Sequence, residues 1–350
     1  MISAQINSEI QIPGIGIINE TLLSVYNGMS IDSLMSEKLF EHLFNGNLSE
    51  IELAGMLMAM RLRGETPDEI SGAVRSMRKF CRNLDLGTDM VFDTCGTGGD
   101  NSGSFNISTS AAIILSAMGV PVAKHGNRSV SGKSGSTDFL EALGIPVNLK
   151  DDDAKNYYRR NNFIYMAAPE YHPAMKFAVP VRKKLGVRTI FNYLGPFTNP
   201  AGARRQAIGF FSHELLEKYA ATALQLNYDR VLLYSSYDGM DEVSPFDKTM
   251  VYEIQNNVLN SFIIEPEEYI SKDEALLIPS HLNPDENAVL FIDTLSCGME
   301  TPLGKLLALN SALAMFAFDE RTSIKESFYT INKEIVSGAV KAKLDSLIKG

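Results

Sequence analysis

Glycine residues gather in one short part of the chain, where they could form a site for a phosphorylated ligand. Eight of the 26 glycines fall within residues 96–135. The first cluster reads Asp93-Thr94-Cys95-Gly96-Thr97-Gly98-Gly99-Asp100 and precedes a helix expected to open at Asn106-Ile107-Ser108-Thr109. A glycine-rich turn lets backbone N–H groups approach a ligand closely, and the N-terminus of a helix adds a partial positive charge. This pattern predicts phosphate binding.

A second cluster runs from Lys124 to Ser136 and holds three cations, several hydroxyl groups and no acid. It follows an expected strand at Pro121–Lys124, just as the first cluster follows one at Met90–Asp93. Open α/β sheets bind ligands at the carboxyl ends of their strands. We therefore expect both clusters to face one crevice, where one polyanion could touch both.

Two common nucleotide-binding fingerprints fail when they are compared with these clusters. Gly96-Thr97-Gly98 would need a glycine at position 101 to complete G-x-G-x-x-G, and that position is Asn101. Five residues separate Gly126 from Gly132, whereas the P-loop has four between its glycines. The Rossmann and P-loop interpretations are therefore weak.

Two further segments contain charged residues that could bind a metal ion or an anion. Adjacent carboxylates at Asp241-Glu242 could hold Mg²⁺ through oxygen ligands, although in isolation such a pair is more often a solvated acidic turn. Residues 171–205 contain seven cations and no acid. This basic segment could contact nucleic acid, steer a small anion or form a solvated helix face.

The composition is that of an ordinary globular protein, with 350 residues, 45% hydrophobic and 21% charged. A formal net charge of −10 argues against general adhesion to nucleic acid or to an anionic membrane. The three cysteines form no C-x-x-C pair, so a reducing compartment fits best. Residues 1–17 lack the basic start of a signal peptide, and no apolar run reaches membrane-spanning length. We expect a cytoplasmic protein that binds neither nucleic acid nor membrane.

The surrounding pattern predicts the elements that position these residues. Residues 20–86 read as all-helical, with capping boxes beginning at Ser49 and Thr66 and a helix end at Gly64. Beyond residue 90, short apolar runs alternate with helical stretches, which predicts an α/β domain with a largely parallel sheet. The expected strands are Met90–Asp93, Pro121–Lys124, Val187–Asn192, Ala207–Phe211, Arg230–Ser235, Met250–Ile254 and Ser261–Ile264. The expected helices are 106–118, 137–143, 151–161, 173–185, 214–226, 286–296, 303–317 and 324–347.

Five motifs in order resemble those of the anthranilate phosphoribosyltransferase family. They are Gly96-Thr97-Gly98-Gly99-Asp100, Asn106-Ile107-Ser108-Thr109, Lys124-His125-Gly126-Asn127-Arg128, Gly195-Pro196-Phe197-Thr198-Asn199-Pro200 and Asp241-Glu242. The resemblance implies that anthranilate and phosphoribosyl pyrophosphate are joined, with release of pyrophosphate, in tryptophan biosynthesis. It also implies an extension at 1–17, a small helical domain at 18–88 completed by about 180–205, a large α/β domain at 89–350 with a mixed, mostly parallel sheet, and a homodimer formed through the small domain.

The same resemblance implies a role for individual residues. It implies that anthranilate contacts Gly96, Asn127 and Arg182, and that Ser108, Asp241 and Glu242 bind Mg²⁺, with two ions per monomer. No general base is assigned. It implies phosphoribosyl pyrophosphate contacts at Gly96, Gly99, Asp100, Ser104, Asn106, Ile107, Ser108, Thr109, Lys124, His125, Gly126, Asn127, Arg128, Ser129, Val130, Ser131, Gly132 and Ser136.

Two positions depart from the family pattern, and two rival interpretations stay open. Ser104 stands where threonine is commoner, and Tyr193 replaces an apolar residue, which could alter the shape of the pocket. A pyrimidine nucleoside phosphorylase-like enzyme would have a related fold but would not need the Asp241-Glu242 pair. A nucleic-acid-binding paralogue would instead use a basic surface and lose affinity steeply with salt.

Overall fold

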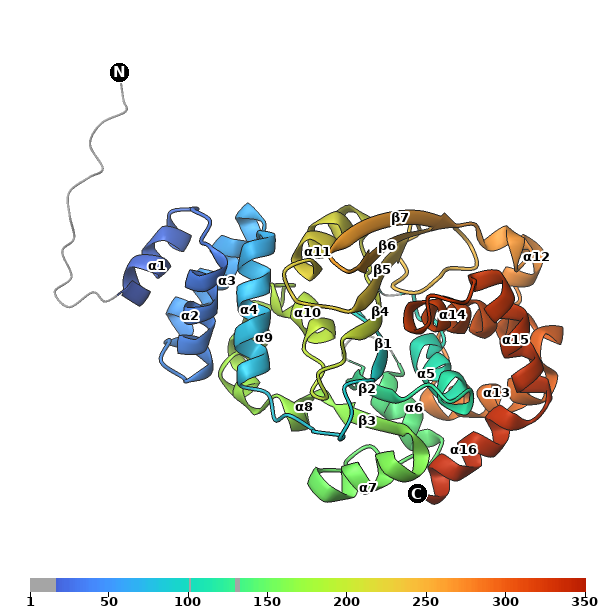
Figure 1. The fold of residues 1–350 in the computed structure, drawn as a ribbon. Helices are drawn as coiled ribbons and strands as arrows, with labels where there is room; N and C mark the ends of the chain where they lie inside the picture. Colours follow the sequence, from blue (N-terminus) through green and yellow to red (C-terminus); the bar gives the residue numbers. More distant parts are fainter. Residues whose placement is uncertain (1–16, 101, 130–132) are drawn as a thin grey trace.

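The computed structural model describes residues 17–100, 102–129 and 133–350. An N-terminal helical region lies at one end of the molecule, and an α/β body forms the rest (Figure 1). The helical region consists of α1 (Ile17–Tyr26), α2 (Ser33–Phe44), α3 (Glu50–Arg63) and α4 (Pro67–Lys79).

The α/β body contains seven strands and the remaining helices. The strands are β1 (Phe92–Gly96), β2 (Val122–Gly126), β3 (Phe163–Ala167), β4 (Arg205–Gly209), β5 (Arg230–Ser236), β6 (Thr249–Gln255) and β7 (Val258–Ile264). The α-helices are α5 (Ile107–Ala117), α6 (Ser136–Ala142), α7 (Asp151–Asn161), α8 (Ala168–Tyr171), α9 (Val179–Leu185), α10 (Phe191–Leu194), α11 (Leu216–Ala223), α12 (Lys272–Ala275), α13 (Pro284–Cys297), α14 (Pro302–Phe318), α15 (Ile324–Val336) and α16 (Ala339–Lys349). Short 3₁₀ turns are η1 (Pro173–Phe177), η2 (Gly195–Phe197), η3 (His213–Leu215), η4 (Pro266–Glu268) and η5 (Gly298–Glu300).

The two capping boxes expected from the sequence are present. Ser49 and Thr66 each accept a backbone N–H three residues along, and Glu52 and Glu69 reach back to the caps. Helix α3 ends at Arg63 because Gly64 has a φ of 87°, a value that favours glycine. The helical pattern stops at Lys79, so the expectation that it extends to residue 86 is wrong.

The sheet has the order β3-β2-β1-β4-β5-β6-β7. Strands β1 to β5 pair in parallel, and β6 and β7 add antiparallel strands at one edge. This confirms the predicted mixed, mostly parallel sheet. The chain runs from β1 toward β2 and β3 on one side and then returns to β4 on the other, so the crossover reverses between β1 and β4. Ligand sites of open α/β sheets form at such a reversal.

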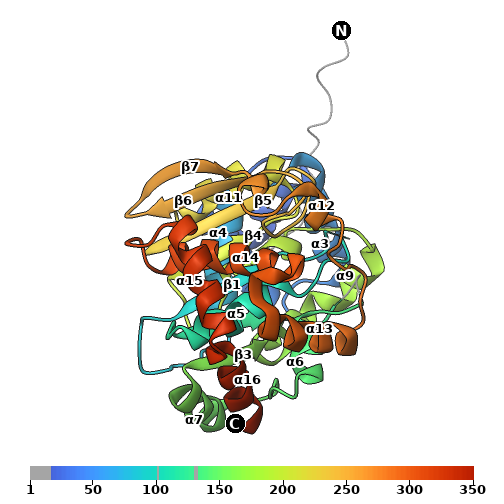
Figure 2. The same cartoon turned by 90° about the vertical axis from the view of Figure 1, so that its right-hand side faces the viewer.

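Successive residues of the central strands pack into two separate hydrophobic cores. On β5, Leu232 belongs to the core with α5 and α14, whereas Val231 and Leu233 belong to the core with α4 and α11. The turned view shows α14, α15 and α16 in front of the sheet (Figure 2). Both faces of the sheet are therefore covered, which leaves the ends of the strands for a ligand.

The segment from α9 to α10 joins the core of the helical region. Val181 and Phe191 are buried in the same cluster as Phe40 and Phe44 of α2, and the Phe191 ring lies 5.9 Å from that of Phe40. Residues more than 100 positions apart in sequence thus share one core. The helical region is held against the α/β body by this returning segment.

Three sequence-based assignments of elements are wrong. Val187–Asn192 forms no strand, because the Asn192 side chain accepts the Thr189 N–H at 3.0 Å and closes a turn there, and residues Phe191–Leu194 form the short helix α10. Strand β3 was missed, although its five residues are all buried. The single helix expected at 324–347 is two helices, α15 and α16, separated at Gly338, which has a φ of 84°.

Among the described residues, no single helix is both long and apolar enough to cross a membrane. One pair of helical segments bent by 86°, Pro284–Glu300 with Pro302–Phe318, meets the length and composition criteria only when both are taken together.

Glu69 is buried and its side chain binds three other residues of the helical region, so its replacement should destabilise the protein. Its carboxylate accepts the Ile31 N–H at 3.1 Å, the Thr66 N–H at 2.9 Å and, on its two oxygens, Arg63 Nη2 at 2.6 and 2.5 Å. We expect Glu69→Gln to lower the free energy of unfolding in urea by about 3 kcal/mol, because the guanidinium loses its buried partner.

Glu50→Gln is the matched control, since Glu50 pairs with Lys184 at the surface. It should change stability by less than about 1 kcal/mol. Equal effects of the two substitutions would contradict the role assigned to Glu69.

Candidate active site

The carboxyl ends of the parallel strands place the two glycine clusters side by side. Loop 1 (residues 97–106) follows β1, and loop 2 (residues 127–135) follows β2. Asn106 of loop 1 donates to the Ser134 carbonyl at 3.3 Å and accepts from the Ser134 hydroxyl at 2.8 Å. The Thr109 and Ser136 hydroxyls add a bond of 3.0 Å. The described parts of both clusters therefore lie at the same edge of the sheet, and the crevice that would bind one polyanion between them stays a prediction.

Two paired glycines let Asp241 approach the end of the sheet closely. Gly96 and Gly209 are direct neighbours in the β1–β4 pairing. A Cβ atom on Gly96 would lie 2.3 Å from Asp241 Oδ2, and one on Gly209 would lie 1.7 Å from the Asp241 carbonyl oxygen. A side chain at either position would displace Asp241. The acid therefore lies where the sheet reverses its order.

Asp241 and its neighbour Glu242 bind loop 1 and the start of α5. Asp241 Oδ2 accepts the Gly98 N–H at 2.6 Å, and Glu242 Oε1 accepts the Ser108 N–H at 3.0 Å. Only 7% of Asp241 and 5% of Glu242 is exposed. The solvated acidic turn that the sequence alone left open is therefore excluded. These carboxylates hold the glycine loop and the helix N-terminus in place.

Burial makes this pair of acids electrostatically costly. It raises the pKa of Asp241, and the charge of Asp100 raises it further. Burial likewise raises the pKa of Glu242, with Asp241 adding to the effect, while Lys124 and the Ser108 N–H oppose it. Neither acid has an ion pair within the described part of the chain. A divalent cation bound here would relieve the repulsion.

The residues present fit a hard cation that keeps other ligands. Among the described residues there is no group of three or more His, Cys, Asp or Glu side chains that could enclose a metal ion. Mg²⁺, however, is commonly held by one or two carboxylates together with water and substrate phosphates. Asp241 and Glu242 offer oxygen atoms, and the nearby Asp100 Oδ2 is buried without a hydrogen-bond partner. The donor set suits Mg²⁺.

Several backbone N–H groups of loop 1 and of the first turn of α5 have no acceptor among the described residues. The Thr97 N–H is taken by the Gly209 carbonyl and the Gly98 N–H by Asp241. The N–H groups of Gly99, Asp100 and Thr109 donate to no acceptor within residues 17–100, 102–129 and 133–350. Gly98 and Gly99 have φ values of 64° and 73°, which favour glycine. These amides suit phosphate oxygens.

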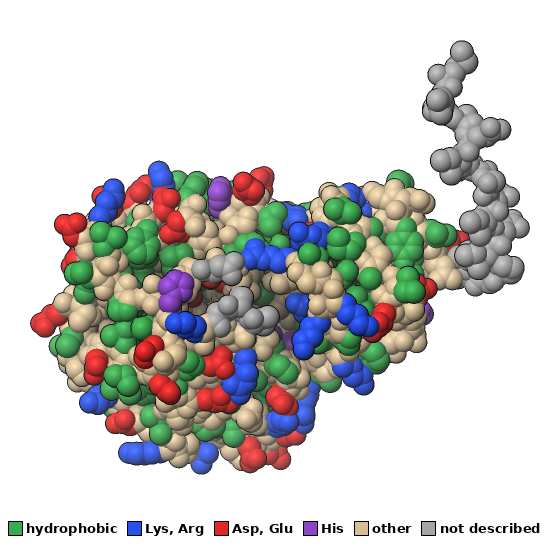
Figure 3. Space-filling model, turned by 180° about the vertical axis from the view of Figure 1, so that it is seen from behind, with side chains coloured by type: hydrophobic (Ala, Val, Ile, Leu, Met, Phe, Trp, Pro, Cys, Tyr) green, Lys and Arg blue, Asp and Glu red, His purple; other side chains and the backbone are tan. Residues whose placement is uncertain are grey.

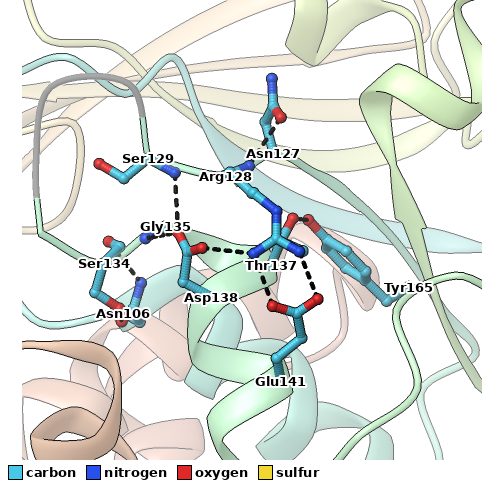
Figure 4. Close-up of polar contacts among 10 residues, drawn as sticks. All are labelled: Asn106, Asn127, Arg128, Ser129, Ser134, Gly135, Thr137, Asp138, Glu141 and Tyr165. Atoms are coloured by element: carbon cyan, nitrogen blue, oxygen red, sulfur yellow. Dashed lines mark hydrogen bonds and ion pairs between the residues drawn. The ribbon is translucent and has the colours of Figure 1, made fainter.

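Loop 2 is tied to the first turns of α6 by charged side chains (Figure 4). The Arg128 guanidinium binds Glu141 with both arms and Asp138 at 2.8 Å. Asp138 also accepts the Ser129 N–H at 3.1 Å and the Gly135 N–H at 2.9 Å. Although the cluster itself contains no acid, α6 supplies two. The charge of Arg128 is already compensated.

Lys124 and Asp93 lie beneath the loops rather than on them. Lys124 is 1% exposed, and its ammonium group donates to the Thr94 carbonyl at 2.6 Å. Asp93 is fully buried and accepts the His125 N–H at 3.1 Å, the Asn199 amide at 2.8 Å and the Gln206 amide at 3.2 Å. This network fixes the end of β2, where loop 2 begins.

His125 lies against a second buried histidine that the sequence did not single out. Its ring centre is 5.0 Å from that of His172, which precedes η1. Burial lowers the pKa of His125, and His172 and Lys124 lower it further. Burial also lowers the pKa of His172 to about 4. Both rings are therefore neutral at pH 7.

The residues expected to contact anthranilate lie on separate elements. Asn127 is exposed on loop 2, Gly96 ends β1 and Arg182 lies on α9. The Arg182 guanidinium lies 5.4 Å from the centre of the Phe191 ring and has no acid partner among the described residues. Burial lowers its pKa. No contact joins these three residues within the described part of the chain.

Other expected residues take the following places. Ser104 donates its N–H to Ser102, and Gly126 packs so closely that a Cβ atom would lie 2.9 Å from the Tyr165 ring. Tyr193 is buried and stacks on Phe211, with ring centres 5.6 Å apart. Ile107 is buried at the start of α5. The expected contacts Val130, Ser131 and Gly132 lie outside the described residues.

Several residues of the site were not assigned from the sequence. Gly209 and Asn287 lie far along the chain from the motifs they support, and Asn287 donates to Asn106 at 3.0 Å, whereas Asp138 lies just beyond the second cluster, in α6. Arg188 was counted only as part of the basic segment. Lys and Arg side chains gather along the junction between the helical region and the α/β body on the face drawn in Figure 3. A basic rim beside buried acids favours a small polyanion with its metal.

Two family models match the chain in turn. One, described as the glycosyl transferase family helical bundle domain, matches residues 20–81. The other, the glycosyl transferase family a/b domain, matches residues 88–341. The fold and the phosphate-suited site thus define the class, a glycosyl transferase with both parts present.

Curated relatives and solved structures narrow the class. The chain is 38% identical to anthranilate phosphoribosyltransferase of Ruminiclostridium cellulolyticum over 95% of its own length and 97% of that protein, and 39% identical to that of Geobacillus thermodenitrificans over 90% and 94%. The Thermus thermophilus enzyme structure aligns with a TM-score of 0.86 at 34% identity, covering 94% of this chain and 98% of that one. A Saccharomyces cerevisiae structure in complex with PRPP and Mg aligns at 0.85 and 25% identity, covering 95% and 98%. The chain belongs to the anthranilate phosphoribosyltransferase family.

The buried neutral His172 should contribute to acid instability. Because its folded pKa, about 4, is below the unfolded value near 6.5, the unfolded chain binds more protons between these pH values, and stability falls as the pH falls through that window. We expect this group to cost about 2 kcal/mol between pH 7 and pH 5.

Urea unfolding of wild type and His172→Asn at both pH values measures this contribution. The variant should lose less stability on acidification than wild type, whatever its stability at pH 7. His213→Asn, at an exposed position, is the control and should follow wild type. Parallel pH profiles for wild type and His172→Asn would contradict the assignment.

Proposed function

We propose that this protein transfers the phosphoribosyl group of 5-phosphoribosyl 1-pyrophosphate to the amine of anthranilate. The products are N-(5-phosphoribosyl)anthranilate and pyrophosphate, and the reaction belongs to tryptophan biosynthesis. Family membership supports this function. The observation that carries it is the buried pair Asp241 and Glu242, held against a glycine loop whose free N–H groups suit phosphate.

Loop 1 and the start of α5 would bind the pyrophosphate. The N–H groups of Gly99, Asp100 and Thr109 are available, and the helix adds its partial positive charge. The hydroxyls of Ser104, Ser108 and Thr109 lie on the same segment. Loop 2 would form the opposite wall, from Lys124 through Gly132 to Ser136. These directional donors would bind the phosphate and ribose oxygens.

Ser108, Asp241 and Glu242 would hold Mg²⁺, with two ions per monomer. All three offer oxygen atoms, as this cation prefers. When bound, Mg²⁺ neutralises charge on the departing pyrophosphate. Support comes from the burial of two adjacent acids with no cationic partner in the described part of the chain, and from the Saccharomyces cerevisiae relative, whose structure contains PRPP and Mg.

Arg182, Asn127 and the Gly96 backbone would bind anthranilate. The planar guanidinium suits a carboxylate with two parallel hydrogen bonds, and that of Arg182 lacks an acid partner among the described residues. Tyr193 and Phe211 would form an aromatic wall nearby. The carboxylate is what distinguishes anthranilate from a plain aniline, so Arg182 would determine substrate choice.

The reaction would be a displacement at the ribose C1 carbon with inversion. Positive charge develops on the sugar as pyrophosphate leaves, and the loop 1 amides would stabilise the leaving group. An aromatic amine is already neutral at pH 7, so the nucleophile needs no strong base. His125 would line the pocket as a neutral ring, because burial lowers its pKa.

We also propose the organisation implied by the family. The chain would comprise an extension at 1–17, a helical domain at 18–88 completed by residues 180–205, and an α/β domain at 89–350. It would act in the cytoplasm as a homodimer formed through the helical domain. Several large apolar side chains exposed on α1 to α3 support that interface, and they include Leu23, Leu34, Ile51 and Leu62.

The activity is tested by following the loss of anthranilate fluorescence with phosphoribosyl pyrophosphate, with and without Mg²⁺. We expect metal-dependent consumption. Phosphorolysis of thymidine with inorganic phosphate would instead favour a nucleoside phosphorylase. DNA affinity that falls steeply with salt, without turnover, would favour a nucleic-acid-binding paralogue.

Removing the two acids should abolish the metal dependence. We expect Asp241→Asn with Glu242→Gln to reduce turnover at limiting Mg²⁺ by at least about 100-fold, because charge stabilisation of the leaving group is lost. Asp238→Asn, in the same loop, is the control, since among the described residues the Asp238 carboxylate accepts from the Ser244 hydroxyl and the Met240 N–H. Wild-type turnover in the double variant would refute the metal role.

A further inference from the structure

Arg188 lies in the irregular stretch between α9 and α10 and contacts three separate parts of the molecule. Its guanidinium donates to the Gly99 carbonyl of loop 1. The same group lies over the Phe211 ring, 3.8 Å from the ring centre. Its own carbonyl accepts from Arg61 of α3 at 2.5 Å. One residue thus connects loop 1, the end of β4 and the helical region.

The bond to Gly99 fixes the direction of the next N–H group. A trans peptide is planar, so its carbonyl and its N–H point in opposite directions. With the Gly99 carbonyl held by Arg188, the Asp100 N–H must point away from the guanidinium. That N–H is one of the donors with no acceptor in the described residues. Since glycine at φ 73° rotates easily, the peptide needs such a restraint.

The aromatic contact keeps the guanidinium itself in one orientation. A planar guanidinium stacks on an aromatic face, whereas an ammonium group has no plane to align. Phe211 is in turn stacked on Tyr193. Arg188 forms no ion pair with any acid in the described part of the chain. The Phe211 ring therefore orients the guanidinium, which donates to the Gly99 carbonyl of loop 1.

We propose that Arg188 is a positioning residue for pyrophosphate binding, which acts by pinning the Gly99–Asp100 peptide so that its N–H faces the phosphate. This inference rests on the proposed function. Arg188 itself need not touch the substrate. Because the Arg188 carbonyl accepts a hydrogen bond from Arg61 of α3, a shift of the helical region would also move Arg188 and, through it, loop 1.

The experiment measures the affinity for inorganic pyrophosphate with Mg²⁺ by calorimetry, together with KM for each substrate. Arg188→Met keeps an apolar side chain over Phe211 and removes every donor. We expect its Kd for pyrophosphate and its KM for phosphoribosyl pyrophosphate to rise about tenfold, as for a lost charge-assisted hydrogen bond. The KM for anthranilate should stay within about twofold.

Arg78→Met is the matched control. Arg78 also donates to a backbone carbonyl, that of Phe197 at 2.8 Å, and lies 5.7 Å from the Tyr228 ring centre, but it has no hydrogen bond to the described residues of loop 1. It should leave the pyrophosphate Kd unchanged. Arg188→Lys keeps one donor and loses the plane, so we expect a smaller increase in Kd than for Arg188→Met, and this variant serves if the methionine variant does not fold.

Three results would overturn the proposal. They are equal effects of Arg188→Met and Arg78→Met on the pyrophosphate Kd, a rise in the KM for anthranilate as large as that for phosphoribosyl pyrophosphate, and a wild-type pyrophosphate Kd in Arg188→Lys. A wild-type protein that binds pyrophosphate with Mg²⁺ but does not consume anthranilate would refute the proposed function and leave the role of Arg188 measurable by the same calorimetry.

Discussion

The site depends on two carboxylates that are buried where the sheet reverses its order. Asp241 fits there only because Gly96 and Gly209 face each other without side chains. From this position it holds Gly98, while Glu242 holds the first turn of α5. Burying two like charges lowers the stability of the folded protein, and these charges lie at the place where a cation and an anion would bind.

The loops around these acids are restrained from several sides. Loop 1 is held by Asp241 from the sheet, by Arg188 from the junction and by His281, whose N–H donates to the Gly103 carbonyl at 2.7 Å. Loop 2 is held by Asp138 of α6. Each restraint uses up groups that would otherwise compete for the ligand. The N–H groups of Gly99, Asp100 and Thr109, which have no acceptor among the described residues, are the ones that would be available to a ligand.

The fold class and the motifs could be predicted from the sequence because the patterns that indicate them are local. Glycine clusters, capping boxes and apolar periodicity each lie within a few residues, and they located both loops at one edge of the sheet. The pairing of Gly96 with Gly209, the neutralisation of Arg128 and the contact from Arg188 depend on residues from 10 to more than 100 positions away. Strand β3 was missed because a short apolar run has no period to distinguish it. The strand expected at 187–192 failed because Asn192 caps a turn there.

The compensated state of Arg128 also bears on what kind of anion the protein can select. With that guanidinium bound to Asp138 and Glu141, and with Lys124 buried on the Thr94 carbonyl, two of the three cations of the second cluster already have partners within the protein. The anion would then be recognised by oriented backbone N–H groups, and the strength of their hydrogen bonds depends on angle as much as on charge. Tetrahedral oxyanions such as phosphate would match donors arranged in this way, whereas spherical chloride from the medium would gain little from mere proximity. Selection between such anions would depend on geometry as well as on charge.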